Sequence, residues 1–281
     1  MKTFITIPTY NEAPTIGSLI EQILGLGLAD LGILVIDDSS TDGTREVVTQ
    51  LAQAHPSVKL VERLDHYRGK ATASLVGFDL ALQLGADQIV EMDGDFSHNP
   101  QDIPQLLAAL QDSEISIGSR LVMGGMDLRP KAKRVFSFFT NFYIRVALER
   151  RSHRSVVNDW TSRFRAYRRE VLVKIPPFTL LPGSDALGQE LLFRALNAGM
   201  RVKELPIQMV SRPSGCSGLD FMEGVHCFLS VLAYAILYRF RNMDFSLGHL
   251  QAKVVDQSSY QVTSIEASAD PAHAPRIQIS S

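Results

Sequence analysis

The sequence predicts an α/β protein with a mostly parallel central sheet, because short strand-like and longer helix-like stretches alternate through its first half. The strand-like stretches are rich in β-branched residues and end at Gly, Pro or Asp: 4–7, 32–38, 58–62, 88–93 and 115–119. Helical patterns lie between them at 15–26, 44–54, 71–84 and 103–110. This alternation indicates a sheet with helices on both faces and a ligand beyond the carboxyl ends of its strands.

The second half has fewer strands and longer helical stretches. We expect helices over 130–150 and 185–198 and strands over 163–167 and 202–210. Another helix is expected over 219–241, with an apolar core at 225–238. That core would cover about 21 Å at roughly 1.5 Å per residue, short of the ~30 Å hydrocarbon layer. We expect it to lie at a membrane interface, or in the core or an oligomer interface, rather than to span a membrane.

Charge is distributed unevenly along the 281 residues. The net charge is −2, but 129–174 contains 13 Lys and Arg against 3 Asp and Glu. These basic residues flank the apolar stretch VFSFFTNFYI. A basic, partly apolar segment on an acidic protein indicates an anionic partner, either phosphates or an anionic membrane surface, and we expect no nucleic-acid partner. Two cysteines provide no disulfide framework, and MKTFITIP shows no cleaved leader, so we expect a reducing, cytoplasmic compartment.

Acidic and amide residues follow three of the expected strands. They are Asn11 and Glu12, Asp37 and Asp38, and Asp93 and Asp95. Two carboxylates as close as Asp93 and Asp95 raise each other's pKa unless a cation lies between them. Carboxylate oxygens suit Mg²⁺ or Mn²⁺, which substrate phosphates and water usually complete. The pair therefore predicts a metal–phosphate site, with a solvated turn as the alternative.

The stretch VIDDSSTDGT (35–44) combines a strand end with a turn rich in hydroxyl groups. Ser39, Ser40 or Thr41 is expected to cap the following helix. Capping leaves Asp37 and Asp38 unexplained, and these carboxylates are suited to hydrogen bonds with a base or ribose.

Five stretches carry a resemblance to a known family. They are IPTYNE (7–12), VIDDSSTDGT (35–44), VEMDGDFSHNP (90–100), GSR (118–120) and DWTSRFRAYRREVL (159–172). Together they resemble the family-2 glycosyltransferases, and more narrowly the dolichol-phosphate mannose synthases and their bacterial polyprenol-phosphate relatives. The resemblance covers residues 2–240. It implies the glycosyltransferase-A-type nucleotide-sugar fold and inverting transfer of a hexose, most simply mannose or glucose, from a GDP- or UDP-linked sugar to a polyprenyl phosphate.

The resemblance also implies roles for individual residues. The nucleoside would be framed by Pro8, Tyr10, Glu12, Ile36 and Asp38. Asp93 and Asp95, with Gly94 between them, would hold Mg²⁺ or Mn²⁺ on the diphosphate. Arg120 and Arg212 would bind phosphate oxygens, Asp159 would line the acceptor side or act as a base, and Glu190 corresponds to a family acid. Asp95, Asp159, Arg120 and Arg212 are thus the expected catalytic residues.

The same resemblance suggests a division of the chain. Residues 1–218 would form the catalytic domain, with 1–120 holding the donor and metal and 121–218 the acceptor. Residues 219–250 would form a membrane-facing helical segment, so that the enzyme is peripheral on the cytoplasmic face. The polar stretch 251–281 is expected to be a disordered tail.

Several positions depart from the family pattern. The family's D-R-x-x-G-E-S-K reads SRPSGCSG at 211–218, so Gly218 replaces a phosphate-binding lysine. Arg163 replaces the glycine of G-F-R, Gly188 replaces the glutamine of Q-x-E, and Lys70 lies in YRGKATA where the family has L-G-L-G-T-A. These changes leave the donor half intact and keep a second hypothesis open, a family-2 glycosyltransferase with a glycan or small-molecule acceptor.

Two further hypotheses are weaker. A phosphatase with a nucleophilic D-x-D motif would carry the pair after its first strand, whereas this pair follows the fourth. A descendant that binds nucleotides without catalysis also remains open.

Overall fold

The computed structural model describes residues 1–63, 69–148, 157–177, 180, 186–211 and 260–263. Their centre is an eight-stranded sheet of order β10-β3-β2-β1-β4-β7-β5-β8. The strands are β1 (Thr3–Thr9), β2 (Leu31–Asp37), β3 (Val58–Arg63), β4 (Gln88–Glu91), β5 (Ile115–Ser119), β7 (Arg165–Arg168), β8 (Val202–Pro206) and β10 (Tyr260–Thr263). Neighbouring strands are parallel except where β7 pairs with β4 and β5, and β10 with β3. The predicted α/β fold with a mostly parallel sheet is confirmed.

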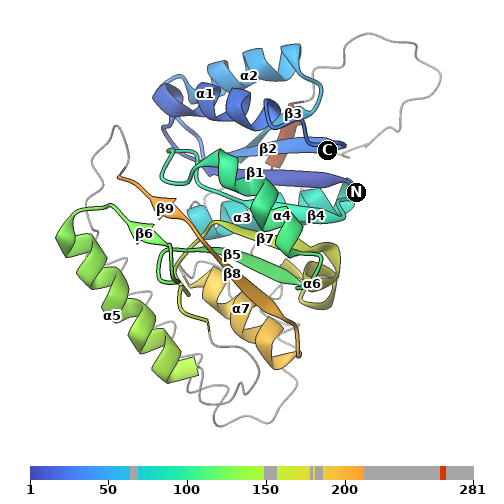
Figure 1. Ribbon diagram of the computed structural model, residues 1–281. Helices are drawn as coiled ribbons and strands as arrows, with labels where there is room; N and C mark the ends of the chain where they lie inside the picture. Colours follow the sequence, from blue (N-terminus) through green and yellow to red (C-terminus); the bar gives the residue numbers. More distant parts are fainter. Residues whose placement is uncertain (64–68, 149–156, 178–179, 181–185, 212–259, 264–281) are drawn as a thin grey trace.

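Helices cover both faces of the sheet (Figure 1). They are α1 (Ala13–Leu24), α2 (Thr44–Ala54), α3 (Lys70–Gln83), α4 (Ile103–Ala109), α5 (Lys131–Leu148), α6 (Arg169–Lys174) and α7 (Leu187–Asn197), with a 3-10 turn at Pro100–Asp102. Alternate residues along each strand face opposite sides of the sheet. Leu34 and Ile36 pack in the core formed with α3, α6 and α7, whereas Ile33 and Val35 pack in the core formed with α1, α2 and α4.

Three expectations about secondary structure need correction. The strand expected over 202–210 is interrupted at Ile207: β8 ends at Pro206, and β9 (Gln208–Met209) pairs with β6 (Met126–Asp127) in a separate two-stranded sheet. Helix α2 begins after Gly43, whose φ of 95° favours glycine and which has no side chain to cap the helix. The prediction that Ser39, Ser40 or Thr41 caps this helix is therefore wrong.

The third correction concerns four residues of the expected disordered tail, whose other residues lie outside the described part of the chain. Residues 260–263 form β10, which extends the sheet by pairing antiparallel with β3. Backbone hydrogen bonds at a sheet edge do not require an apolar segment, so the polar composition of 251–281 did not indicate this strand. The expected helix over 219–241 lies outside the described residues.

Helix α5 packs against the rest of the protein through one narrow face. Its narrow buried face consists of Ser137, Asn141, Ile144 and Leu148. Its phenylalanines are exposed and do not pack in the core of the described residues. No helix in the described part of the chain is long and apolar enough to cross a membrane.

Candidate active site

The acid pair lies where the fold places a ligand. Strands β2, β1 and β4 are parallel neighbours, so their carboxyl ends meet at one edge of the sheet. Asp93 and Asp95 follow β4 at this edge and are largely buried. Because both carboxylates are buried, water screens their mutual repulsion only weakly. A positive partner is therefore needed to keep both ionised.

The turn that carries the acid pair is shaped by Asp95 itself. Its Oδ1 accepts a hydrogen bond from the backbone N–H of Ser97 at 3.0 Å, and Phe96 between them has a φ of 57°. A Cβ added at Gly94 would lie 3.4 Å from Ile7, an ordinary contact. The bend therefore depends on Phe96 rather than on freedom at Gly94.

Two cations of the chain approach Asp93. Its Oδ1 lies 3.6 Å from Arg163 Nε and 3.8 Å from Lys70 Nζ. Arg163 also contacts Glu91, with Nη2 and Oε1 3.2 Å apart. Part of the positive charge that the acid pair requires is thus supplied by two residues at which the sequence departs from the family.

The donor set around the pair fits a small divalent cation. Asp93 and Asp95 offer hard carboxylate oxygens, and the buried Ser97 Oγ beside them has no hydrogen-bond partner among the described residues. The described residues contain no group of three His, Cys, Asp or Glu side chains that could enclose a metal. Two carboxylates leave most coordination positions for substrate oxygens and water, which is typical of Mg²⁺ and Mn²⁺ bound to phosphates.

His98 is a site residue that the sequence interpretation missed. It is 1% exposed, its ring stacks on Phe164 at 5.0 Å, and neither nitrogen has a hydrogen-bond partner among the described residues. Burial lowers the pKa of His98, and nearby Asp93 and Asp95 oppose this effect. Its position in FSHNP, directly after the acid pair, was the available signal.

The predicted nucleoside residues gather on the strands beside the pair. Pro8 is buried in β1 and Ile36 in β2, whereas Tyr10, just beyond β1, is 53% exposed. Glu12 lies at the start of α1, and its backbone N–H donates to Thr44 Oγ1 at 2.9 Å. An exposed aromatic ring beside buried strand ends is a suitable surface for stacking a base.

The two loops at this edge are tied together by their polar side chains. Asn11 N–H donates to Ser40 Oγ, Thr41 N–H donates to Asn11 Oδ1, and Ala13 N–H donates to Asp42 Oδ2. The hydroxyl-rich turn of VIDDSSTDGT therefore stabilises the loop after β1. Its Asp42 also accepts a hydrogen bond from the backbone N–H of Thr44, the first residue of α2, at 3.1 Å.

Asp38 holds the beginning of α3 in place. Its carboxylate accepts hydrogen bonds from Arg63 Nη1 at 2.8 Å and from the Gly69 N–H at 2.6 Å. Arg63 is almost completely buried. Asp37 is also buried, and burial raises its pKa despite the hydrogen bond that it accepts from the Ser40 N–H. The Asp38 interaction fixes the position of Lys70, the first residue of α3.

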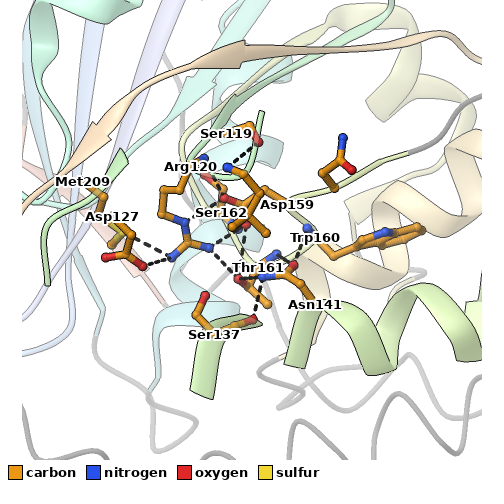
Figure 2. Close-up of polar contacts among 12 residues, drawn as sticks. Ser119, Arg120, Asp127, Ser137, Asn141, Asp159, Trp160, Thr161, Ser162 and Met209 are labelled. Atoms are coloured by element: carbon orange, nitrogen blue, oxygen red, sulfur yellow. Dashed lines mark hydrogen bonds and ion pairs between the residues drawn. The ribbon is translucent and has the colours of Figure 1, made fainter. Parts of the chain in front are cut away.

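Arg120 and Asp159 form a buried ion pair (Figure 2). Arg120 donates to the Asp159 carboxylate from Nε at 2.7 Å, from Nη2 at 2.6 Å and from its backbone N–H at 3.0 Å. Thr161 Oγ1 and the Ser162 N–H donate to the same carboxylate. Burial opposes ionisation of Asp159, but the hydrogen bonds and charge of Arg120 outweigh it and lower the pKa of Asp159. In this geometry the pair stabilises the 159–162 loop; its predicted phosphate-binding and acceptor roles stay predictions.

Asn141 connects this loop to α5 (Figure 2). Its Oδ1 accepts from the backbone N–H groups of Trp160 and Thr161, and its Nδ2 donates to Thr161 Oγ1. The exposed helix is therefore coupled to the Arg120–Asp159 pair.

The remaining predicted residues lie elsewhere or beyond the described chain. Glu190 is buried in α7 and pairs with Arg194. Arg212 lies outside the described residues. Val210, two residues before it, lies beside the turn that carries the acid pair, and its N–H donates to Ser97 O at 3.3 Å.

The sequence matches the model of glycosyl transferase family 2 over residues 4–175. The chain belongs to this family. A polyprenol monophosphomannose synthase of Mycolicibacterium smegmatis is 37% identical over 225 residues, 78% of this chain and 81% of the relative. An undecaprenyl-phosphate mannosyltransferase of Micrococcus luteus is 30% identical over 88% of this chain and 100% of the relative.

A solved structure shares the fold. Glucosyl-3-phosphoglycerate synthase of Mycobacterium tuberculosis, in complex with Mn²⁺, uridine diphosphate and glucosyl-3-phosphoglycerate, superposes with a TM-score of 0.57 at 18% identity. The match covers 87% of this chain and 81% of that one. The predicted glycosyltransferase-A-type architecture and the assignment as a glycosyltransferase are confirmed.

Proposed function

We propose that the protein transfers a hexose, with mannose first among the candidates, from a GDP- or UDP-linked sugar to a polyprenyl phosphate at a membrane surface. The acid pair at the carboxyl edge of a family-2 glycosyltransferase sheet carries this proposal. Relatives named for polyprenol and undecaprenyl phosphate support the lipid acceptor.

Asp93 and Asp95 would hold Mg²⁺ or Mn²⁺, with Ser97 beside them. When bound, the metal would neutralise charge on the departing nucleoside diphosphate. The buried strand ends and the exposed ring of Tyr10 would receive the nucleoside, and the cations around Asp93 would face the diphosphate. A structure of the same fold that contains Mn²⁺ and uridine diphosphate supports this use of the site.

The acceptor phosphate needs little activation. Its second pKa is about 6, so its oxygen is largely ionised near neutral pH. Positioning then contributes more than a general base. Asp159 is fully buried and accepts five hydrogen bonds, which suits it to orient the acceptor loop rather than to take a proton.

The exposed face of α5 supports docking on an anionic bilayer at the cytoplasmic side. Its large apolar side chains are 45–63% exposed: Val135, Phe136, Phe138, Phe139, Phe142 and Val146. Lys131, Lys133, Arg134 and Arg145 lie on the same helix. An aromatic face with basic residues is typical of a helix in the plane of a membrane interface, and Asn141 would connect that interface to the site.

The proposal is tested with a panel of labelled nucleotide sugars and purified polyprenyl phosphates in vesicles. The expected product is a sugar-labelled lipid whose formation requires Mg²⁺ or Mn²⁺. Label transferred only to water-soluble compounds would favour the non-lipid acceptor.

A further inference from the structure

Arg163 lies opposite Asp93 because of strand register. Strand β7 runs antiparallel to β4, and Arg165 pairs with Glu91. In an antiparallel pair, moving two residues back along one strand corresponds to moving two residues forward along the other. Arg163, two residues before Arg165, therefore lies opposite Asp93, two residues after Glu91. The antiparallel strand therefore delivers a cation to a site otherwise built from parallel strands.

The guanidinium of Arg163 is held on one side. Its Nη2 donates to Ser74 Oγ at 3.0 Å and to Glu91 Oε1 at 3.2 Å, and Ser74 Oγ donates to Glu91 Oε1 at 2.5 Å. Its Nε lies 3.6 Å from Asp93 Oδ1. Glu91 and Ser74 thus orient Arg163 toward the acid pair.

Arg163 also has room to change partners. The side chain is 30% exposed, and a cavity of about 80 Å³ lies beside it. Glu91, Ser162, Arg163, Arg165 and Gly188 are among the residues that line the cavity. Arg165 in its wall is held by hydrogen bonds to backbone carbonyls of Ser162, Trp160 and Gly188, whereas the side chain of Arg163 is partly exposed.

We propose that Arg163 binds the diphosphate of the donor. Without donor it is the counter-ion of Asp93, with Lys70 as its neighbour. With donor its Nε exchanges the carboxylate for a phosphate oxygen, while Glu91 keeps hold of Nη2. Arg163 and a divalent cation therefore compete for Asp93 in the absence of donor. This inference rests on the proposed donor and metal site, but not on the lipid acceptor.

Two titrations of the full chain test the proposal. The first measures Mn²⁺ binding alone by electron paramagnetic resonance. The second measures UDP and GDP binding in EDTA by calorimetry. Arg163→Gly should bind Mn²⁺ about fivefold more tightly, because a positive charge 3.6 Å from Asp93 is removed. The same variant should bind the preferred nucleoside diphosphate about tenfold more weakly, because a charged contact to phosphate is lost.

The opposite signs distinguish phosphate binding from a structural role, since a distorted site would bind both ligands less well. Arg163→Lys, which keeps the charge but has a single ammonium group, should bind Mn²⁺ like the wild type and should lose less nucleotide affinity than Arg163→Gly. Arg201→Ala, which removes an exposed arginine paired with Glu114, is the matched control and should change neither.

The proposal is overturned if Arg163→Gly binds Mn²⁺ no more tightly than the wild type, or if it binds the nucleotide equally well. It is also overturned if the wild type binds neither UDP nor GDP in EDTA. Failure of the lipid acceptor would leave both titrations unaffected. Failure of the metal site would appear separately, as unchanged Mn²⁺ affinity in Asp95→Ala.

Discussion

Replacing Asp159 by asparagine should destabilise the protein strongly. Asp159 has no exposed surface, and its carboxylate accepts hydrogen bonds from Arg120, Thr161 and Ser162. Asparagine removes the charge and places an amide N–H₂ against these donors. The Arg120 side chain, only 3% exposed, would then be left with Asp127 at 4.0 Å as its nearest carboxylate.

The expected loss in the free energy of unfolding is about 3–5 kcal/mol, the usual effect of removing one partner from a buried ion pair. Urea denaturation followed by fluorescence of Trp160, which adjoins the pair, measures this loss. Glu114→Gln, which breaks the exposed pair with Arg201, is the control and should have a much smaller effect.

The pH dependence gives a second measure of the same interaction. The pKa of Asp159 in the folded protein lies below its ordinary value of 3.8. Its contribution is therefore complete above about pH 4 and is lost as the pH falls through the folded-state pKa. The stability difference between the wild type and Asp159→Asn should shrink over that range. A loss below about 1 kcal/mol at neutral pH would refute the view that this pair holds the loop.

Three other predictions concern the metal, the membrane and His98. Asp95→Ala should abolish transfer and remove the Mg²⁺- or Mn²⁺-dependent part of nucleotide binding in calorimetry; unchanged turnover would contradict the metal site. Phe139→Ser and Phe142→Ser should each weaken co-sedimentation with anionic vesicles about tenfold, since burying a phenylalanine contributes roughly 1.5–3 kcal/mol. Val173→Ser, exposed on α6, should not weaken it. Burial lowers the pKa of His98 in the folded protein. As the pH falls below about 6.5, the imidazole therefore gains a proton in the unfolded protein before it does so in the folded one. The free energy of unfolding should fall over that range. His98→Asn should lack this dependence of stability on pH. If chemical denaturation gave the same pH dependence for the variant and the wild type, His98 would not be a buried neutral ring.

The sequence predicted the parts of the fold that depend on local pattern. Alternating strands and helices located β1 to β5 and α1 to α4 to within a few residues, because apolar periodicity and breaking residues act over short distances. The acidic strand ends meet at one edge because parallel strands share their direction. The position of Asp93 and Asp95 at that edge follows from the same pattern.

The interactions that complete the site depend on strand order. Nothing in the local sequence indicates that β7 inserts antiparallel between β4 and β5, and this insertion alone brings Arg163 to Asp93. The pairing of Arg120 with Asp159 joins residues 39 positions apart. Such contacts arise from tertiary packing, which a motif does not encode.

The most direct test follows a labelled sugar into its product. Wild-type protein, its nucleotide sugar and Mn²⁺ are incubated with equal amounts of polyprenyl phosphate in vesicles and 3-phosphoglycerate in solution. We expect label in the lipid phase, and none there with Asp95→Ala. Label confined to the aqueous phase with the wild type would contradict a polyprenyl-phosphate acceptor.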